Sequence, residues 1–411
     1  MSDRPLHSVD DLAEAGLLSP SDVLRAVEAR YGVAVTPQIA ALIDRGDPDD
    51  PIAKQFLPDA RELIATPQEL ADPIGDEAHS PVAGIVHRYR DRVLLKLVSV
   101  CPVYCRFCFR RETVGKGGAL DPRTLVRALD YVAAHEEISE VILTGGDPLA
   151  ASARRLRAVS ERLATIAHVT RLRVHTRVPT AAPGLVTKER LAALRAAEKT
   201  LVVALHVNHA RELSSNAEAA IARLREAGAK LLSQTVLLKG VNDDAPTLDA
   251  LLDSLVGQGV EPYYLHHPDL AKGTAHFRLS LARGREIYTA LVRLRRTKPL
   301  PRYVLDLPGG FGKIPVEAPH LLQCEDGSWR ARDRFGVERR YEEELVSSSR
   351  SLPRLRQPRR VAGHQVDLEV DRLAGLALAE RRDFQRVRDD QHAKTVALDL
   401  VDGERNAVER D

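Results

Sequence analysis

The sequence predicts an α/β protein, a partial (β/α)6-type, TIM-like barrel with an N-terminal helical region and a poorly structured C-terminal tail. Short apolar strand patterns alternate with single helix patterns between about residues 85 and 320. Strands separated by single helices indicate parallel βαβ units. Six or seven such units favour a partial barrel over a closed eight-fold one.

Composition narrows the class of protein. The chain has 411 residues, of which 44% are hydrophobic and 29% charged, so collagen-like and fully disordered chains are excluded. The net charge of +2 gives no support to a nucleic-acid partner. No apolar run approaches 18 residues and the N-terminus has no apolar signal region, so we expect no membrane span and a cytoplasmic protein.

The predicted elements divide the chain into three parts. Residues 1–84 form a helical region, with helix starts at Val9 and Ser21. Residues 85–320 form the barrel, and residues 321–411 form an extension in which 351–411 are weakly ordered. Strands are expected at 92–100, 140–144, 171–176, 200–207, 230–238, 262–267 and 303–307. Helices are expected at 121–135, 153–166, 187–197, 216–227, 246–256 and 281–296.

Three of the four cysteines, Cys101, Cys105 and Cys108, lie within eight residues directly after the first barrel strand. A secreted disulfide framework would spread its cysteines along the chain, so this clustering indicates metal chemistry in a reduced compartment. Three thiolates can hold a four-iron cluster and leave one iron open to a small molecule, whereas structural zinc usually has four protein ligands. The fourth cysteine, Cys324, is over 200 residues away.

Two glycine-rich motifs follow other strands. Gly145, Gly146 and Asp147 end the second strand, where glycine lets the backbone approach a ligand. The segment 308–313 (PGGFGK) is not a P-loop, because Ile314 follows its lysine. A lysine in such a loop, Lys313, could form a Schiff base with an aldehyde cofactor or be a surface residue of a turn.

The CxxxCxxC spacing, with Phe107 before the last cysteine, resembles the radical S-adenosylmethionine (SAM) superfamily. The ordered series of motifs HRYRDRVLL, CPVYCRFCFRR, TGGDPL, LHVNH, QTVLLKGVND, YYLHHPDLAKGTAHF and LDLPGGFGKIP resembles the lysine 2,3-aminomutase family over roughly residues 50–320. The resemblance implies a [4Fe-4S] cluster on the three cysteines, SAM and pyridoxal 5′-phosphate (PLP).

The resemblance also implies residue roles. Lys313 matches the lysine that holds PLP, and Arg110 matches the arginine that binds the substrate carboxylate. Asp269 and Asp306 match two acids that receive the distal ammonium of lysine. The remaining matches are cofactor contacts: Arg88, Tyr89 and Arg92 around PLP, and Gly145, Gly146, Asp147, His206 and Gln234 around SAM.

The implied reaction interconverts L-lysine and L-β-lysine through a PLP aldimine and a 5′-deoxyadenosyl radical, with an electron donor such as flavodoxin or ferredoxin. Pro268 stands beside Asp269 where longer relatives have a zinc-binding cysteine, so we expect no zinc. Two alternatives stay open: the branch that makes β-lysine for elongation factor P, and a non-catalytic protein that binds a metal cluster. The sequence leaves the pathway, the reductant and a homo-oligomeric state undecided.

Overall fold

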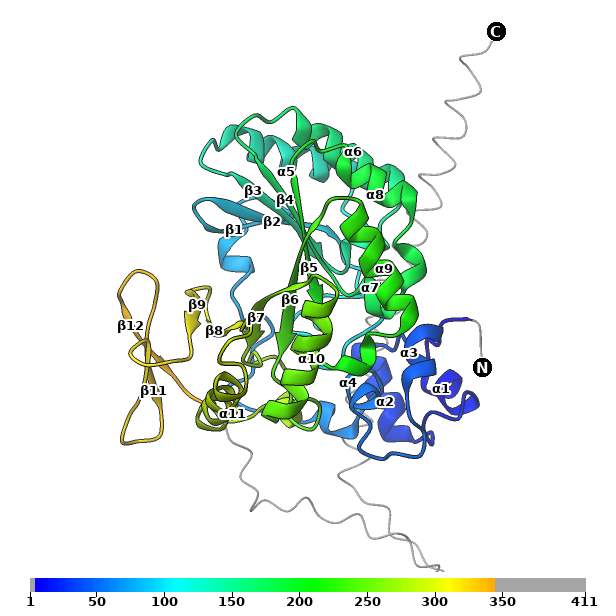
Figure 1. Ribbon diagram of the computed structural model, residues 1–411, viewed down its shortest axis with the longest axis vertical. Helices are drawn as coiled ribbons and strands as arrows, with labels where there is room; N and C mark the ends of the chain where they lie inside the picture. The colour runs from blue at the N-terminus through cyan, green and yellow to red at the C-terminus, as the bar shows by residue number, and fades with distance from the viewer. Residues whose placement is uncertain (1–3, 344–411) are drawn as a thin grey trace, which may run out of the picture.

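The computed structural model describes residues 4–343, in which a curved nine-stranded sheet forms the centre (Figure 1). The strands lie in chain order, β1 to β9. Strands β2 to β8 are parallel to their neighbours, and β1 and β9 pair antiparallel at the two edges. Their bounds are β1 Ile85–Tyr89, β2 Arg92–Val98, β3 Glu140–Gly145, β4 Arg171–Thr176, β5 Thr200–His206, β6 Lys230–Val236, β7 Glu261–His266, β8 Arg302–Leu307 and β9 Gly312–Pro315.

Helical crossovers connect the parallel strands. The main ones are α5 Pro122–Ala134, α6 Ala153–Ala164, α8 Lys188–Arg195, α9 Ser215–Glu226, α10 Ala245–Gly257 and α11 Leu281–Leu294. Shorter turns are η3 Pro148–Ala150, α7 Val178–Ala181, η4 Pro183–Leu185, η5 Ala210–Glu212 and η6 Ala275–Phe277. The predicted partial barrel is confirmed, with every expected strand and crossover helix present.

Alternation along the strands gives the sheet one apolar and one polar face. In β5, Leu201, Val203 and Leu205 join the main hydrophobic core that the crossover helices complete. His206 points the opposite way, as does His175 in β4. The face away from the helices therefore collects polar side chains from several strands.

The N-terminal region consists of α1 Val9–Glu14, α2 Asp22–Tyr31, α3 Pro37–Leu42, α4 Pro51–Phe56, η1 Ala60–Leu63 and η2 Glu77–His79. Serine, threonine and aspartate side chains cap its first helices, as at Ser8, Ser21 and Thr36. Its apolar core includes Val103 of the cysteine loop. This region therefore packs directly on the segment that carries the three cysteines.

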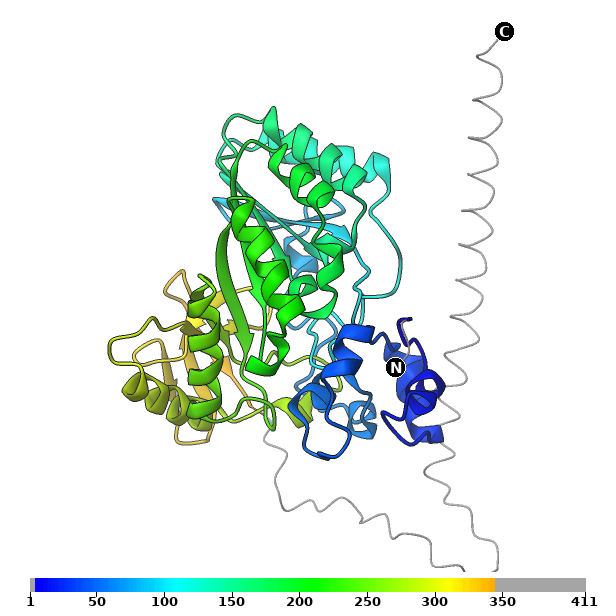
Figure 2. The same ribbon diagram turned by 45° about the vertical axis from the view of Figure 1, so that its right-hand side comes forward.

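Three features escaped sequence reasoning, the first of which is the antiparallel edge strand β1, Ile85–Tyr89. Strand β9 is four residues long and contains Gly312 and Pro315, so it shows no alternating pattern. A separate three-stranded antiparallel sheet follows the barrel, at the side of the molecule seen in Figures 1 and 2, with β10 Leu321–Gln323, β11 Trp329–Arg332 and β12 Glu338–Tyr341. Residues 351–411 lie outside the described part, so their expected weak order stays a prediction. Within residues 4–343, every helix is too short or too polar to span a bilayer.

Candidate active site

A cross-strand pair joins two of the predicted site residues. Lys313 lies directly opposite Asp306 in the β8–β9 ladder. Lys313 Nζ lies 2.9 Å from Asp306 Oδ1 and 2.8 Å from Oδ2, and only 7% of Asp306 is exposed. Although burial disfavours the charged ammonium, the Asp306 carboxylate raises the pKa of Lys313.

The pKa values of the two predicted acids are shifted in opposite directions. Burial raises the pKa of Asp269 to about 8, and the nearby charge of Asp306 adds to this effect. Burial also opposes ionisation of Asp306, but the Lys313 ammonium holds its pKa well below the usual range. His266 Nδ1, 3.7 Å from Asp306 Oδ2, has a lowered pKa because of burial. The site thus holds one carboxylate paired with an ammonium and a second, buried acid whose pKa is raised.

Arg88 and Arg110 meet at a residue that sequence reasoning missed, Asp76. Arg88 Nη2 donates to Asp76 Oδ1 at 3.1 Å, while Arg110 donates to Oδ2 from Nε at 3.0 Å and from Nη2 at 2.8 Å. Arg88 Nη1 also lies 3.8 Å from Asp306 Oδ1. Asp76 therefore links Arg110 to the Lys313–Asp306 pair through Arg88. The sequence around residues 72–80 has no regular pattern that would predict a role for Asp76.

Tyr89 contacts Lys313 directly, whereas Arg92 reaches this group only through the Tyr89 ring. The Tyr89 hydroxyl accepts a hydrogen bond of 3.1 Å from the Lys313 backbone N–H. Arg92 instead pairs with Asp91 at 2.6 Å and lies 3.8 Å from Glu140. Glu140 also binds Arg173 of β4, so the charged partners of Arg92 lie at the start of β2 to β4, although its guanidinium is also 5.8 Å from the centre of the Tyr89 ring.

The cysteine loop after β2 is fixed from two sides. Tyr104 N–H donates to Ala34 O at 2.9 Å, and Arg106 N–H donates to Gln55 O at 2.8 Å. The buried carboxylate of Glu62 pairs with both Arg106, at 2.6 Å, and Arg111. The N-terminal region therefore shapes the loop, a role that its helical patterns did not reveal.

The three thiols share one environment. Desolvation is the main cause that raises the pKa of each, to about 11 for Cys105. A charge on one of these thiols would further raise the pKa of its neighbours in the loop. Cys324 sits between β10 and β11, in the small sheet.

The Gly145–Asp147 loop packs against the start of the cysteine loop. Gly146 N–H donates to Val98 O at 2.6 Å, and Asp147 N–H donates to Val100 O at 2.9 Å. A Cβ on Gly146 would lie 2.2 Å from Val100 O, so only glycine permits this approach. The Asp147 carboxylate accepts hydrogen bonds from Thr176, and from the Arg177 and Val178 N–H groups. The Asp147 side chain is thus engaged within the fold, as are the backbone N–H groups of Gly146 and Asp147.

His206 and Gln234 are neighbours, since they are paired in the β5–β6 ladder. Burial lowers the pKa of His206 to about 3, so its ring is neutral. The ring of His175, on β4, lies 5.8 Å from that of His206. The Nε2 atoms of both rings are buried, and no group of the described residues accepts or donates there. His175 was missed, although its position near the end of β4 matches that of His206 on β5.

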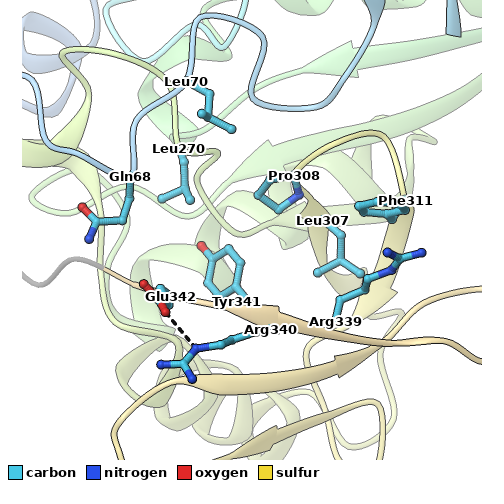
Figure 3. A pocket seen from close by; sticks show the side chains of 10 residues that line it. All are labelled: Gln68, Leu70, Leu270, Leu307, Pro308, Phe311, Arg339, Arg340, Tyr341 and Glu342. Carbon is cyan, nitrogen blue, oxygen red and sulfur yellow. Dashed lines mark hydrogen bonds and ion pairs between the residues drawn. The ribbon is translucent and has the colours of Figure 1, made fainter. Parts of the chain in front are cut away.

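A small cavity of about 320 Å³ lies on the outer side of the glycine-rich loop (Figure 3). It is lined by Pro308 and Phe311 of that loop, by Leu270, and by Arg339 and Tyr341 of β12. The Arg339 guanidinium stacks 3.7 Å from the centre of the Phe311 ring. Because its lining lacks Lys313, Asp306 and the cysteines, we regard this contact as support for the loop and not as the reaction site.

Comparison with known proteins identifies the family. Residues 95–251 match the Radical SAM superfamily. The chain is 36% identical over 321 residues to the L-lysine 2,3-aminomutase of Fusobacterium nucleatum, covering 77% of this chain and 75% of the relative. It is also 36% identical over 293 residues to the Escherichia coli K12 enzyme of that name, covering 71% and 85%. It is 35% identical over 314 residues to the L-lysine 2,3-aminomutase of Clostridium subterminale, covering 76% of this chain and 75% of the relative.

The chain belongs to the lysine 2,3-aminomutase family. It is therefore an isomerase of the radical SAM class, with a [4Fe-4S] cluster, SAM and PLP as cofactors, a small-molecule substrate and a need for reductive activation. The alternative of a non-catalytic cluster protein is set aside by this membership.

The donor set of the cysteine loop fits the cluster of this aminomutase family. Three thiols and no further histidine or carboxylate ligand are what an open-sited four-iron cluster uses. Within residues 4–343, no three His, Cys, Asp or Glu side chains are grouped closely enough to hold one metal ion. A cluster does not require such a group, because each thiolate binds a different iron.

The other two cofactors have matching features. The glycine backbone of 145–146 and the unpartnered ring nitrogens of His175 and His206 offer polar contacts on the strand ends beside the cysteine loop. For PLP, Lys313 offers an amine, and the buried Nε of Arg88 has no partner in the described structure, as expected of a group that awaits an anion.

Proposed function

We propose that this protein interconverts L-lysine and L-β-lysine in the cytoplasm, with Cys101, Cys105 and Cys108 as cluster ligands and Lys313 as the PLP lysine. The observation that carries the choice of substrate is the Lys313–Asp306 pair. In this pair a primary ammonium is bound to a buried carboxylate, and Asp269 is a second acid nearby.

This arrangement favours a substrate with a distal ammonium. If Lys313 held PLP, its nitrogen would no longer be a free ammonium beside Asp306, and that carboxylate would need another cation. The distal ammonium of lysine supplies one, and Asp269 can ionise beside it. A glutamate side chain would meet repulsion at the same place. Arg110 offers a guanidinium for the substrate carboxylate.

Each cofactor contributes chemistry that the protein positions. The cluster, SAM and PLP together supply the radical and the electron sink. The chain's own groups bind and orient: the acids hold the distal ammonium, Arg110 holds the carboxylate and Arg88 neutralises the phosphate. A redox protein such as flavodoxin or ferredoxin would supply the electron.

The test is anaerobic incubation of the reconstituted protein with SAM, PLP, a reductant and L-lysine, with β-lysine as the readout. Lys313→Ala should abolish the product. Lys298→Ala is the matched control, because Lys298 is exposed and pairs only with Asp253 in the described structure. Wild-type protein that carries the three cofactors and forms no β-lysine would refute the proposal.

A further inference from the structure

Asp76 occupies a junction of three parts of the site. Its loop packs against the PLP-lysine loop, because Gly75 approaches Gly309 and Gly310 so closely that a Cβ would lie 2.5 Å from Gly310 N. Its side chain faces Arg88 of β1 and Arg110, which follows the cysteine loop. Only 6% of Asp76 is exposed.

The two carboxylate oxygens are divided between the two arginines. Oδ1 accepts from Arg88, and Oδ2 accepts from Nε and Nη2 of Arg110. Thr144 Oγ1 accepts from Arg110 Nη1 at 2.9 Å. A guanidinium has five N–H donors. These contacts therefore leave one N–H on each terminal nitrogen of Arg110 for a further carboxylate.

The charge of Asp76 is retained in this setting. Burial opposes its ionisation, but Arg110 and then Arg88 more than offset that effect and lower its pKa. Asp76 is therefore an anion between two cations that serve different ligands, the PLP phosphate and the substrate carboxylate.

We propose that Asp76 is a positioning residue that aligns Arg110 for the substrate carboxylate and couples this alignment, through Arg88, to PLP binding. The inference rests on the proposed function of Arg110 and Arg88. It follows that Asp76 sets the preference of the enzyme for an α-carboxylate over an uncharged group at the same place. A residue that only stabilised the loop would affect all ligands alike.

The experiment measures equilibrium binding of L-lysine and L-lysinamide to holoenzyme without SAM, followed by the change in PLP absorbance. Wild-type should prefer lysine. Asp76→Asn should weaken lysine binding on the order of tenfold, the scale of one charge-assisted hydrogen bond, and leave lysinamide binding nearly unchanged. It should also release PLP faster on dialysis. Asp72→Asn is the control, since Asp72 caps the same loop through the Asp76 and Glu77 N–H groups without touching either arginine.

The outcomes separate the two proposals. Wild-type holoenzyme that fails to bind lysine would overturn the proposed function. If wild-type protein and the Asp76→Asn variant both preferred lysine over lysinamide to the same degree, only the role of Asp76 would be overturned. If Asp76→Asn does not fold, Asp76→Glu keeps the charge but moves the carboxylate by one methylene. It should lose part of the preference, and full retention would count against the inference.

Discussion

Lys313 Nζ lies 2.8 Å from Asp306 Oδ2 across the antiparallel pair of β8 and β9. The register of these two short strands thus brings the Lys313 amine into direct contact with the Asp306 carboxylate. Among the described residues, no other lysine amine contacts this carboxylate. Oδ1 of the same carboxylate lies 3.8 Å from Arg88 Nη1, and the other terminal nitrogen of Arg88, Nη2, binds Asp76. The amine, the acid and the arginines form one electrostatic unit, so a change in one should be felt by the others.

Asp306→Asn should weaken lysine binding on the order of 10- to 100-fold, because a buried charge-assisted contact is replaced by a neutral one. The measurement is the KM for L-lysine in the β-lysine assay. Asp253→Asn removes a partner of Lys298 and Arg295, neither of which is a proposed site residue, and should leave KM unchanged. A normal KM for Asp306→Asn would exclude Asp306 from ammonium binding.

Asp269 should make the stability of the PLP-free protein depend on pH. Its pKa is raised from 3.8 to about 8 by burial and by Asp306. The folded state therefore holds a proton that the unfolded state releases above about pH 4, and the stabilisation is lost as pH rises toward 8. Within that window this group should lower the free energy of unfolding by roughly 1 kcal/mol for each pH unit.

Denaturant unfolding at several pH values checks this dependence. Asp269→Asn, which cannot ionise, should show a flatter decline in the free energy of unfolding between pH 4 and 8 than wild-type. Parallel profiles for the two proteins would mean that Asp269 is already ionised in the folded state at neutral pH.

Much of the barrel was predictable because several of its parallel strands are apolar runs ended by a polar or glycine-rich segment. Arg92–Val98 and Thr200–His206 are examples. The cysteine spacing was sufficient, without the structure, to predict an iron–sulfur cluster. The pairing of Lys313 with Asp306 was not predictable from pattern, since β9 has no alternation and its register depends on tertiary packing.

Other site features depend on contacts between distant segments. Asp76 and Glu62 lie in irregular or short helical segments, and their partners are 12 to 49 residues further along the chain. A lone acidic residue in such a segment gives no signal of the arginines that the fold gathers around it. Arg92 illustrates the converse, because it lies beside Tyr89 but forms its ion pairs with Asp91 and Glu140 and none with a predicted site residue.

Glu62→Gln should destabilise the protein by about 3 kcal/mol or more, because it leaves the buried guanidinium groups of Arg106 and Arg111 without their anion. Since Arg106 lies between two cluster cysteines, iron content after reconstitution should fall as well. Thermal unfolding and iron analysis measure the two effects. Glu286→Gln, at an exposed pair with Arg283, should cost less than about 0.5 kcal/mol. Equal stability of the two variants would show that the Glu62 cluster does not hold the loop.

Gly146→Ala should uncouple the Gly145–Asp147 loop from the cysteine loop. The added methyl group would lie 2.2 Å from Val100 O and 2.7 Å from Val100 N, both backbone atoms next to Cys101, so the two loops must separate. Overpacking of this kind costs about 1–3 kcal/mol. The displaced loop should bind SAM more weakly, which equilibrium binding to the reconstituted protein measures.

Gly184→Ala is the matched control for this steric argument, because a Cβ there meets no atom within 4 Å. It should keep wild-type stability and SAM affinity. If both variants bound SAM as tightly as wild-type, the close approach at Gly146 would serve folding alone. If Gly146→Ala lost SAM affinity while keeping its iron, the loop would act on the ligand directly, because the cluster would then be intact while the neighbouring backbone had moved.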